Sequence, residues 1–234
     1  MSTQQQERLL TAILGWVAGY IDTLGFIGLN GLFTAHVTGN LIVAGAEVVG
    51  TGEEDVWVRL AVVPVFMVAV ACTVAYWRSR RCQPASLLWF EALFLLIFLG
   101  VSVVLIPDLN QPISQSTLFI VGSAGIFAMG IQNALMKEAF GTLAPTTVMT
   151  GNVTQFVIDL SQLMGLSHPS GAESQPPSRE TLRKRILKFG SALVGFVVGA
   201  ATGALGLVWV GFWAIALPTV TVALLATRVS GKSL

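Results

Sequence analysis

Residues 19–40, GYIDTLGFIGLNGLFTAHVTGN, and residues 130–152, GIQNALMKEAFGTLAPTTVMTGN, share one pattern. Each stretch begins with a glycine, and a short polar side chain follows three positions later, Asp22 in the first and Asn133 in the second. Each stretch ends in the same triplet, Thr38-Gly39-Asn40 and Thr150-Gly151-Asn152. Polar, helix-breaking residues at matching places in two apolar halves predict a duplicated membrane protein with a site where the halves meet.

The composition around these stretches is that of a membrane protein. Hydrophobic residues make up 54% of the 234 residues, and charged residues only 11%. Soluble domains carry about 25% charged residues. The net charge of +1 gives no basic surface for nucleic acid, so we expect the lipid bilayer as a partner and no nucleic acid.

Eight apolar segments can be recognised along the chain: 9–29, 31–49, 57–77, 87–106, 117–137, 143–163, 186–206 and 208–227. A spanning helix needs about 20 apolar residues. The third, fourth, seventh and eighth are typical spanning helices. In the seventh, Gly195, Gly199 and Gly203 recur every four residues and predict a face for close helix packing. The other four carry polar residues and breaks, which are tolerated at membrane depth only against protein or water.

Loop charge predicts the topology. The basic loops at 78–81 and 179–188 and the basic tail are typical of the cytoplasmic side, and we place the acidic loops at 53–55 and 107–115 outside. Between the outer loop near 110 and the inner loop near 180 the chain must cross an odd number of times, yet two segments lie there. One of the two therefore re-enters, or the pair forms a broken helix.

The same counting in the first half gives six crossings, three in each half, with both termini in the cytoplasm. We therefore expect an all-α membrane protein of two inverted-topology repeats, 1–110 and 111–234, with broken or re-entrant helices around the triplets. Residues 164–185 form a flexible cytoplasmic linker in this prediction. If all eight segments span, the repeats are parallel instead.

The triplets are the strongest candidates for a binding site. A half-helix that begins inside the membrane directs free N–H groups and its positive dipole end towards a cavity. Two such helices, related by the repeat, would converge near the midplane on a small polar or anionic solute. The alternative is that Thr-Gly-Asn only forms a helix break or packs two helices.

Asp22 is either a proton carrier or a structural hydrogen-bond acceptor, because a carboxylate at this depth must face protein or water. Lys137 is its counter-ion or, alternatively, marks a helix end at the membrane surface. Glu91 and Asp159 are expected to lie at the interface. No catalytic motif and no metal-ligand spacing is present, so we expect no enzyme, cofactor or metal site.

The first stretch, with Gly19-Tyr20-Ile21-Asp22 and its triplet, and the second, with Gly130-Ile131-Gln132-Asn133 and its triplet, resemble the YoaK-like family. The resemblance covers essentially the whole chain. It implies a multi-pass bacterial inner-membrane protein and implies no substrate.

Three functions remain open. The first is a secondary transporter or channel for a small solute or ion, with Asn40, Asn152, Thr38 and Thr150 lining the site and Asp22 coupling protons. The second is a membrane scaffold or assembly protein, in which the triplets are packed without a cavity. An intramembrane enzyme is the third, and homo-oligomerisation is open in all three.

Overall fold

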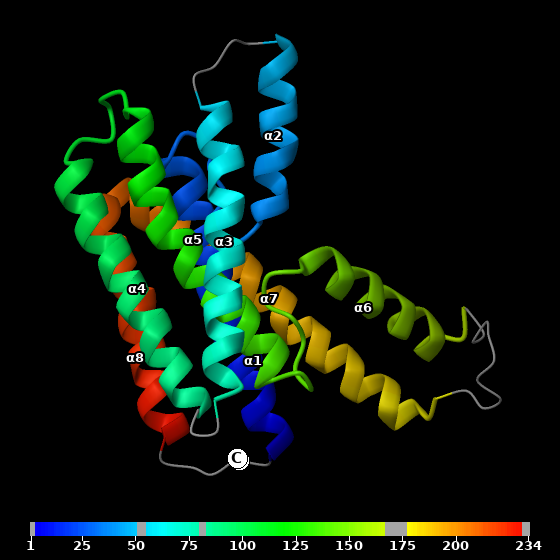
Figure 1. The fold of residues 1–234 in the computed structure, drawn as a ribbon. Helices are drawn as coiled ribbons and strands as arrows, with labels where there is room; N and C mark the ends of the chain where they lie inside the picture. The colour runs from blue at the N-terminus through cyan, green and yellow to red at the C-terminus, as the bar shows by residue number, and fades with distance from the viewer. Residues whose placement is uncertain (1–2, 51–54, 80–82, 167–176, 231–234) are drawn as a thin grey trace.

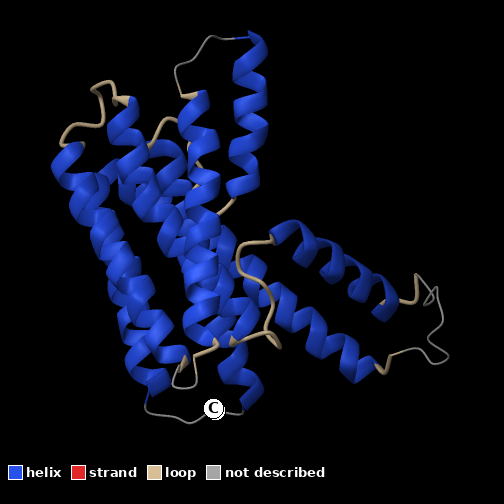
Figure 2. Ribbon diagram, in the orientation of Figure 1, coloured by secondary structure: helices blue, strands red, loops and turns tan. Residues whose placement is uncertain are grey.

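The computed structural model describes residues 3–50, 55–79, 83–166 and 177–230, and all regular structure in these ranges is helical (Figures 1 and 2). The elements are α1 (Thr3–Gly28), α2 (Val37–Gly50), α3 (Val56–Trp77), α4 (Pro84–Leu105), α5 (Gln115–Glu138), α6 (Met149–Leu163), α7 (Arg179–Val210), the 3-10 helix η1 (Gly211–Ile215) and α8 (Ala216–Ser230).

Five helical segments in these ranges are long and apolar enough to cross a membrane: Gln4–Gly28, Val56–Trp77, Pro84–Leu105, Gln115–Glu138 and Arg179–Ser230. The last has 52 residues and contains α7, η1 and α8. The chain turns back between α7 and α8 at Gly211, whose φ of 61° favours glycine. The expectation of an all-α membrane protein therefore holds.

α2 and α6 are each too short to cross a bilayer, and neither is extended by an adjoining helix; α8 also has 15 residues, but it continues directly from the 5 residues of η1. α2 has 14 residues and α6 has 15, against the roughly 20 that a span requires. Figure 1 shows that α2 begins beside the middle of α3 and runs to one end of the bundle, whereas α6 begins near the same level and slants outwards beside α7, away from that end. Each is reached from the preceding long helix by an irregular loop, residues 29–36 before α2 and residues 139–148 before α6.

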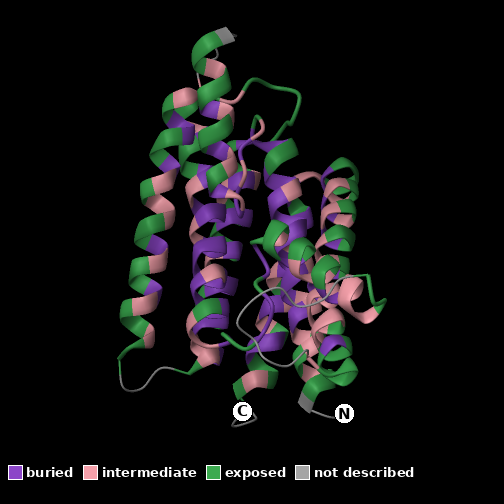
Figure 3. Cartoon of the chain, turned by 90° about the vertical axis from the view of Figure 1, so that its right-hand side faces the viewer, coloured by how far each residue is buried: buried purple, intermediate pink, exposed green. Residues whose placement is uncertain are grey.

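The long helices pack in a repeating order. α1 packs against α7 and α5 against α3, while α2 lies on α3 and α6 lies on α7. α4 packs against both α5 and α8. Buried residues concentrate on the helices in the interior of the bundle (Figure 3).

Glycines form the α1–α7 interface. A Cβ added at Gly195, Gly199 or Gly203 of α7 would collide with the backbone of α1, and Gly19 of α1 meets the backbone of α7 in the same way. Only glycine permits so close an approach of two helices. The glycine face predicted from the spacing in α7 is confirmed.

Charge divides the two ends of the bundle. The end that holds the start of α1 and the close of α8 (Figure 3) carries the basic residues Arg8, Arg78, Arg179, Lys184 and Arg228. The other end carries Asp55 and Asp108. The remaining charges used for the topology lie outside the described residues, and so do residues 167–176 of the 164–185 linker. These charges are Glu53, Glu54, Arg80, Arg81 and Lys232.

Candidate functional site: the two loops that lead into the short helices

The first loop is held by the carboxylate of Asp22. Asp22 is 4% exposed, and its Oδ1 accepts hydrogen bonds from the backbone N–H groups of Thr34 and Ala35 at 2.8 and 2.6 Å. The backbone N–H of His36 donates to the same oxygen at 3.3 Å. The other oxygen lies 2.6 Å from Nδ1 of His36. Three converging N–H groups and a histidine compensate the buried charge of Asp22.

Asn40 closes the same loop from the first turn of α2. Its Oδ1 accepts from the Phe33 N–H at 2.8 Å, and its Nδ2 donates to the Phe33 carbonyl at 2.9 Å. The side chain is fully buried. Gly39 bears no side chain and packs against the ring of Phe33. Asn40 therefore serves as a backbone substitute that joins the loop to the helix.

A buried arginine fastens the end of α1 to α2 and α3. Arg59 of α3 is 3% exposed, and it donates to the carbonyls of Asn30 and Gly31 at 2.6 and 2.8 Å. Its Nε pairs with Glu47 of α2 at 2.8 Å. Asn30 and Gly31 have positive φ angles of 49° and 74°, which turn the chain sharply after α1. Nothing in the sequence had singled out Arg59 or Glu47.

The second loop is held by fewer bonds. Asn152 is 1% exposed, and its Nδ2 donates to the carbonyl of Pro145 at 2.6 Å. Gln132 of α5 reaches the loop, with Nε2 2.8 Å from both the Leu14 carbonyl and Oγ1 of Thr146. Asn133, which we expected to correspond to Asp22, is half-buried. The loop contact comes instead from its neighbour Gln132.

A second arginine–carboxylate pair joins α6 to α7. Arg185 donates from Nε and Nη2 to the two oxygens of Asp159, at 3.1 and 3.0 Å. Gln155 also donates to Asp159 at 2.9 Å. Asp159 is fully buried inside the protein, and its expected place at the membrane interface stays a prediction. The side chain of Arg185 is 40% exposed, unlike that of Arg59.

The triplets divide into a buried and an exposed part. Both asparagines are buried in the loop contacts described above, whereas Thr38, Thr150 and Gly151 are exposed. Thr38 and Thr150 are each the second residue of a short helix. The threonine hydroxyls therefore lie at the surface of the described structure, whereas the asparagine side chains do not.

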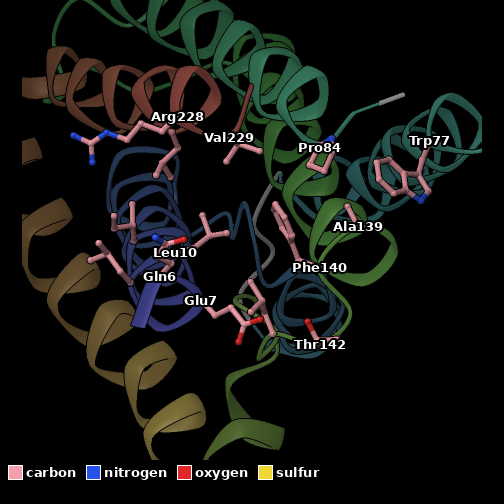
Figure 4. Close-up of a pocket in the computed structure, with 14 residues that line it drawn as sticks. Gln6, Glu7, Leu10, Trp77, Pro84, Ala139, Phe140, Thr142, Arg228 and Val229 are labelled. Atoms are coloured by element: carbon pink, nitrogen blue, oxygen red, sulfur yellow. The ribbon is translucent and has the colours of Figure 1, made fainter. Parts of the chain in front are cut away.

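A cavity of about 580 Å³ opens at the basic end of the bundle (Figure 4). Its wall combines the start of α1, the end of α8, Pro84 at the start of α4, and Phe140, Thr142 and Leu143 from the loop before α6. Glu7 and Arg228 supply its charged groups. The cavity thus borders the second loop and not the first.

Other candidates have different surroundings. Lys137 is exposed at the last turn of α5 and marks a helix end, and the ion partner of Asp22 is His36. Glu91 of α4 is fully buried inside the protein, and its expected place at the membrane interface stays a prediction. Within the described ranges, no group of three or more histidine, cysteine or acidic side chains could hold a metal ion.

The comparisons with known proteins agree with the resemblance stated above. The chain is 25% identical over 166 residues to the "UPF0700 transmembrane protein YoaK" of Bacillus subtilis (strain 168), covering 69% of this chain and 70% of that protein. No solved structure matches the chain. The model of the family described as "Protein of unknown function (DUF1275)" matches residues 10–227. With nearly its whole length matched, this chain belongs to that membrane-protein family, and the predicted YoaK-like relationship is confirmed.

Proposed function

We propose that this protein is a secondary transporter or channel for a small polar or anionic solute, built from two inverted-topology repeats. The observation that carries the proposal is the pair of short helices, α2 and α6, which start at mid-depth and leave it in different directions: α2 runs to the acidic end, and α6 slants outwards beside α7, away from that end (Figure 1). Interrupted helices that meet near the midplane are the usual sites of solute binding in transporters with inverted repeats.

The packing of the helices supports the duplication. If α1, α2, α3 and α4 correspond to α5, α6, α7 and α8, then the contact of α1 with α7 corresponds to that of α5 with α3. The contact of α2 with α3 likewise corresponds to that of α6 with α7. Gly19 packs on Phe196 of α7, and Gly130, its counterpart in the sequence pattern, packs on Phe66 of α3.

The side-chain bonds that hold the two short helices in place also support the duplication. Asn40 bonds to Phe33, and Asn152, 112 positions later, bonds to the residue 112 positions after Phe33, which is Pro145. Glu47 and Asp159 are also 112 apart. Each of these carboxylates pairs with an arginine near the start of the next long helix.

This correspondence implies a topology. α1, α3, α4, α5, α7 and α8 would cross the bilayer, with α2 re-entering from the acidic end and α6 from the basic end. Lys and Arg concentrate on the cytoplasmic side of membrane proteins. Both termini therefore belong in the cytoplasm, and the cytoplasmic membrane is the expected location.

Hydrogen-bond donors at the two helix starts favour a polar or anionic solute. Thr38 and Thr150 are exposed at mid-depth, where lipid tails offer a hydroxyl no hydrogen-bond partner. Backbone N–H groups in the first turn of a helix add a partial positive charge there. The cavity at the basic end gives water a route towards the loop before α6.

A scaffold without transport is the second candidate, and it is favoured by a different observation. Asp22, Asn40 and Asn152 all bind backbone groups of their own loops. These three side chains therefore have a sufficient structural role without any solute. The hydroxyls of Thr38 and Thr150 are the groups that separate the two candidates.

The test compares Thr38→Val/Thr150→Val with Asn40→Ala/Asn152→Ala. Valine has the shape of threonine without the hydroxyl, and both sites are exposed, so the first variant should fold normally. Purified proteins would be screened by thermal shift with small anions, amino acids and sugars, because a solute that binds the folded state raises its melting temperature. A solute that shifts the wild type would then be followed by flux into proteoliposomes.

Transport predicts that one solute class stabilises the wild type, that the valine variant loses both shift and flux, and that its unliganded melting temperature is unchanged. If no solute acts on the wild type and the asparagine variant alone changes folding, the scaffold function replaces the proposal. Flux that persists in the valine variant would move the binding site away from the triplets.

A further inference from the structure

Glu91 is a buried carboxylic acid that takes no part in the contacts described for the two loops and the short helices. It lies in α4 and is fully buried. Neither carboxyl oxygen has a hydrogen-bond partner within the part of the chain that the structure describes. An ionised carboxylate without a partner is strongly disfavoured in a protein interior, whereas a neutral carboxylic acid is tolerated.

The register of α4 on α5 places Gln132 opposite Glu91. Phe98 of α4 packs on Gly125 of α5, where an added Cβ would lie 3.2 Å from Cε1 of the ring. Glu91 precedes Phe98 by seven residues, and Gln132 follows Gly125 by seven. Seven residues are two helical turns and return to the same helix face. Because the helices are antiparallel (Figure 1), both steps lead to the same level.

Gln132 has a buried side-chain oxygen that can accept a hydrogen bond from Glu91. Its Oε1 is buried and accepts no hydrogen bond from a described residue. Its Nε2 is committed to the Leu14 carbonyl and to Thr146 of the second loop. A protonated carboxyl group has one O–H to donate. Glu91 in its neutral form is therefore the natural donor to Oε1 of Gln132.

No charge on the neighbouring elements pairs with Glu91. The charged residues of α5 are Lys137 and Glu138 in its last turn, α8 carries Arg228 near its end, and η1 carries none. From α3, Tyr76 contacts Phe90 beside Glu91, with ring centroids 5.1 Å apart. None of these groups forms an ion pair with Glu91 among the described residues.

The cavity at the basic end reaches the start of α4, the helix that carries Glu91, although Glu91 itself does not line it. Pro84 lines that cavity, and Glu91 lies seven residues further along the same face of α4, about 10 Å along the helix axis. A proton released from the carboxyl group would pass to water in the cavity. The release leaves a carboxylate that can no longer donate to Gln132.

We infer that Glu91 is a proton-binding site whose hydrogen bond to Gln132 links the protonation state to the loop before α6. With the proton bound, Glu91, Gln132 and Thr146 form one chain of hydrogen bonds. Without the proton, Gln132 faces a carboxylate and its hold on Thr146 weakens. The inference deepens the proposed function, on which it rests, by naming the proton as the coupling ion. α8, the counterpart of α4, contains no acidic residue, so the proton-binding site belongs to one half only.

The test reads protonation directly and needs no solute. Wild-type protein in lipid nanodiscs would be titrated while the C=O stretching band of protonated carboxylic acids is followed by infrared spectroscopy. Glu91→Gln should remove a band that persists at neutral pH, and the control Glu138→Gln should keep it. Gln132→Leu should keep the band but shift it to the frequency of an acid without a hydrogen-bond partner.

A second readout leaves the chain unaltered. Dicyclohexylcarbodiimide modifies protonated carboxyl groups in apolar surroundings, and mass spectrometry of the wild type should locate the adduct on Glu91. Its yield should fall about tenfold for each pH unit above the titration midpoint. A neutral-pH band that survives Glu91→Gln, or a wild type without an adduct on Glu91, overturns the inference. A proton on Glu91 in a protein that moves no solute would overturn the proposed function alone.

Discussion

The two irregular loops occupy corresponding places in the sequence but are held very differently. Loop 29–36 is bound by the Asp22 carboxylate, by both polar atoms of Asn40 and by a buried arginine, Arg59. Loop 139–148 is bound by the neutral Gln132 and by a single donor bond from Asn152 to its backbone. The second loop also borders the cavity, and its Pro145 and Val148 are exposed.

In the proposed duplication, this difference gives the two halves different roles. Charge-assisted hydrogen bonds are about twice as strong as neutral ones, so the first loop is the more firmly fixed of the two. Segments that move during function come from the less stable parts of a protein. We therefore expect the first half to act as the fixed frame and the loop before α6 to act as the moving part.

The two arginine pairs should give the largest contrast. Arg59→Leu leaves Glu47 without its ion partner and removes the bonds to Asn30 and Gly31, so it should cost about 4 kcal/mol of unfolding free energy. Arg185→Leu also leaves a buried carboxylate, that of Asp159, but Gln155 still donates to it and no backbone carbonyl loses its donor, so it should cost about 1.5 kcal/mol. Denaturant unfolding in detergent measures both. Equal losses would break the comparison.

The polar side chains from α1 and α5 come next. Asp22→Asn removes the negative charge on which three N–H groups and His36 converge, and it should cost about 3 kcal/mol. Gln132→Leu removes two neutral bonds and should cost about 1.5 kcal/mol. Hydrogen exchange should show loop 29–36 opening in the first variant. Unchanged exchange in that loop would show that Asp22 does not hold it.

Glycine-to-alanine substitutions should also cost more stability at the α1–α7 interface than at the α3–α5 interface. At Gly199 a methyl group would meet the Trp16 backbone of α1, so Gly199→Ala should cost about 3 kcal/mol. At Gly130 it would come within 2.7 Å of the Cβ of Ala69 on α3, which moves only with its backbone, and the cost should be about 2 kcal/mol. Gly100→Ala is the matched control, because a Cβ there meets nothing within 4 Å and alanine favours the helix. Thermal unfolding ranks the three, and a Gly130→Ala loss as large as that of Gly199→Ala would contradict the packing.

The asparagines of the triplets give a similarly small contrast. Asn40→Ala removes two hydrogen bonds to Phe33 and should cost about 2 kcal/mol. Asn152→Ala removes one bond to Pro145 and should cost about 1 kcal/mol. The unfolding midpoints of the two variants, each compared with the wild type, measure these two losses of stability. A larger effect at Asn152 would mean that the second loop is the better fastened of the two.

Much of this architecture could be predicted from the sequence, because interrupted apolar segments and regularly spaced glycines are local signals. The residues that fasten the loops could not be predicted in full. Arg59 contacts residues of the preceding loop and of α2 that only the folded chain brings near it. Gln132 was passed over for Asn133, its neighbour on a different helix face.

Glu91 shows a second limit of the sequence. It stands close enough to the start of α4 for its side chain to reach the membrane surface, and α4 is apolar on every side. A helix without a polar face gives no sign of which side packs inward. Only the register against α5 shows that Glu91 is buried. The exposed threonines and buried asparagines of the triplets were likewise indistinguishable until α2 and α6 were placed.

Cysteine accessibility at Asn30 and Thr142 tests the central claim, the inverted repeat, most directly. These two exposed residues are 112 positions apart, one in each half. In a chain whose Cys72 and Cys82 are replaced by serine, Asn30→Cys and Thr142→Cys would be exposed to a membrane-impermeant maleimide. We predict that Asn30→Cys is labelled in intact cells and that Thr142→Cys is labelled only after the membrane is opened. Labelling of both from the same side would contradict the inverted repeat and the transport mechanism built on it.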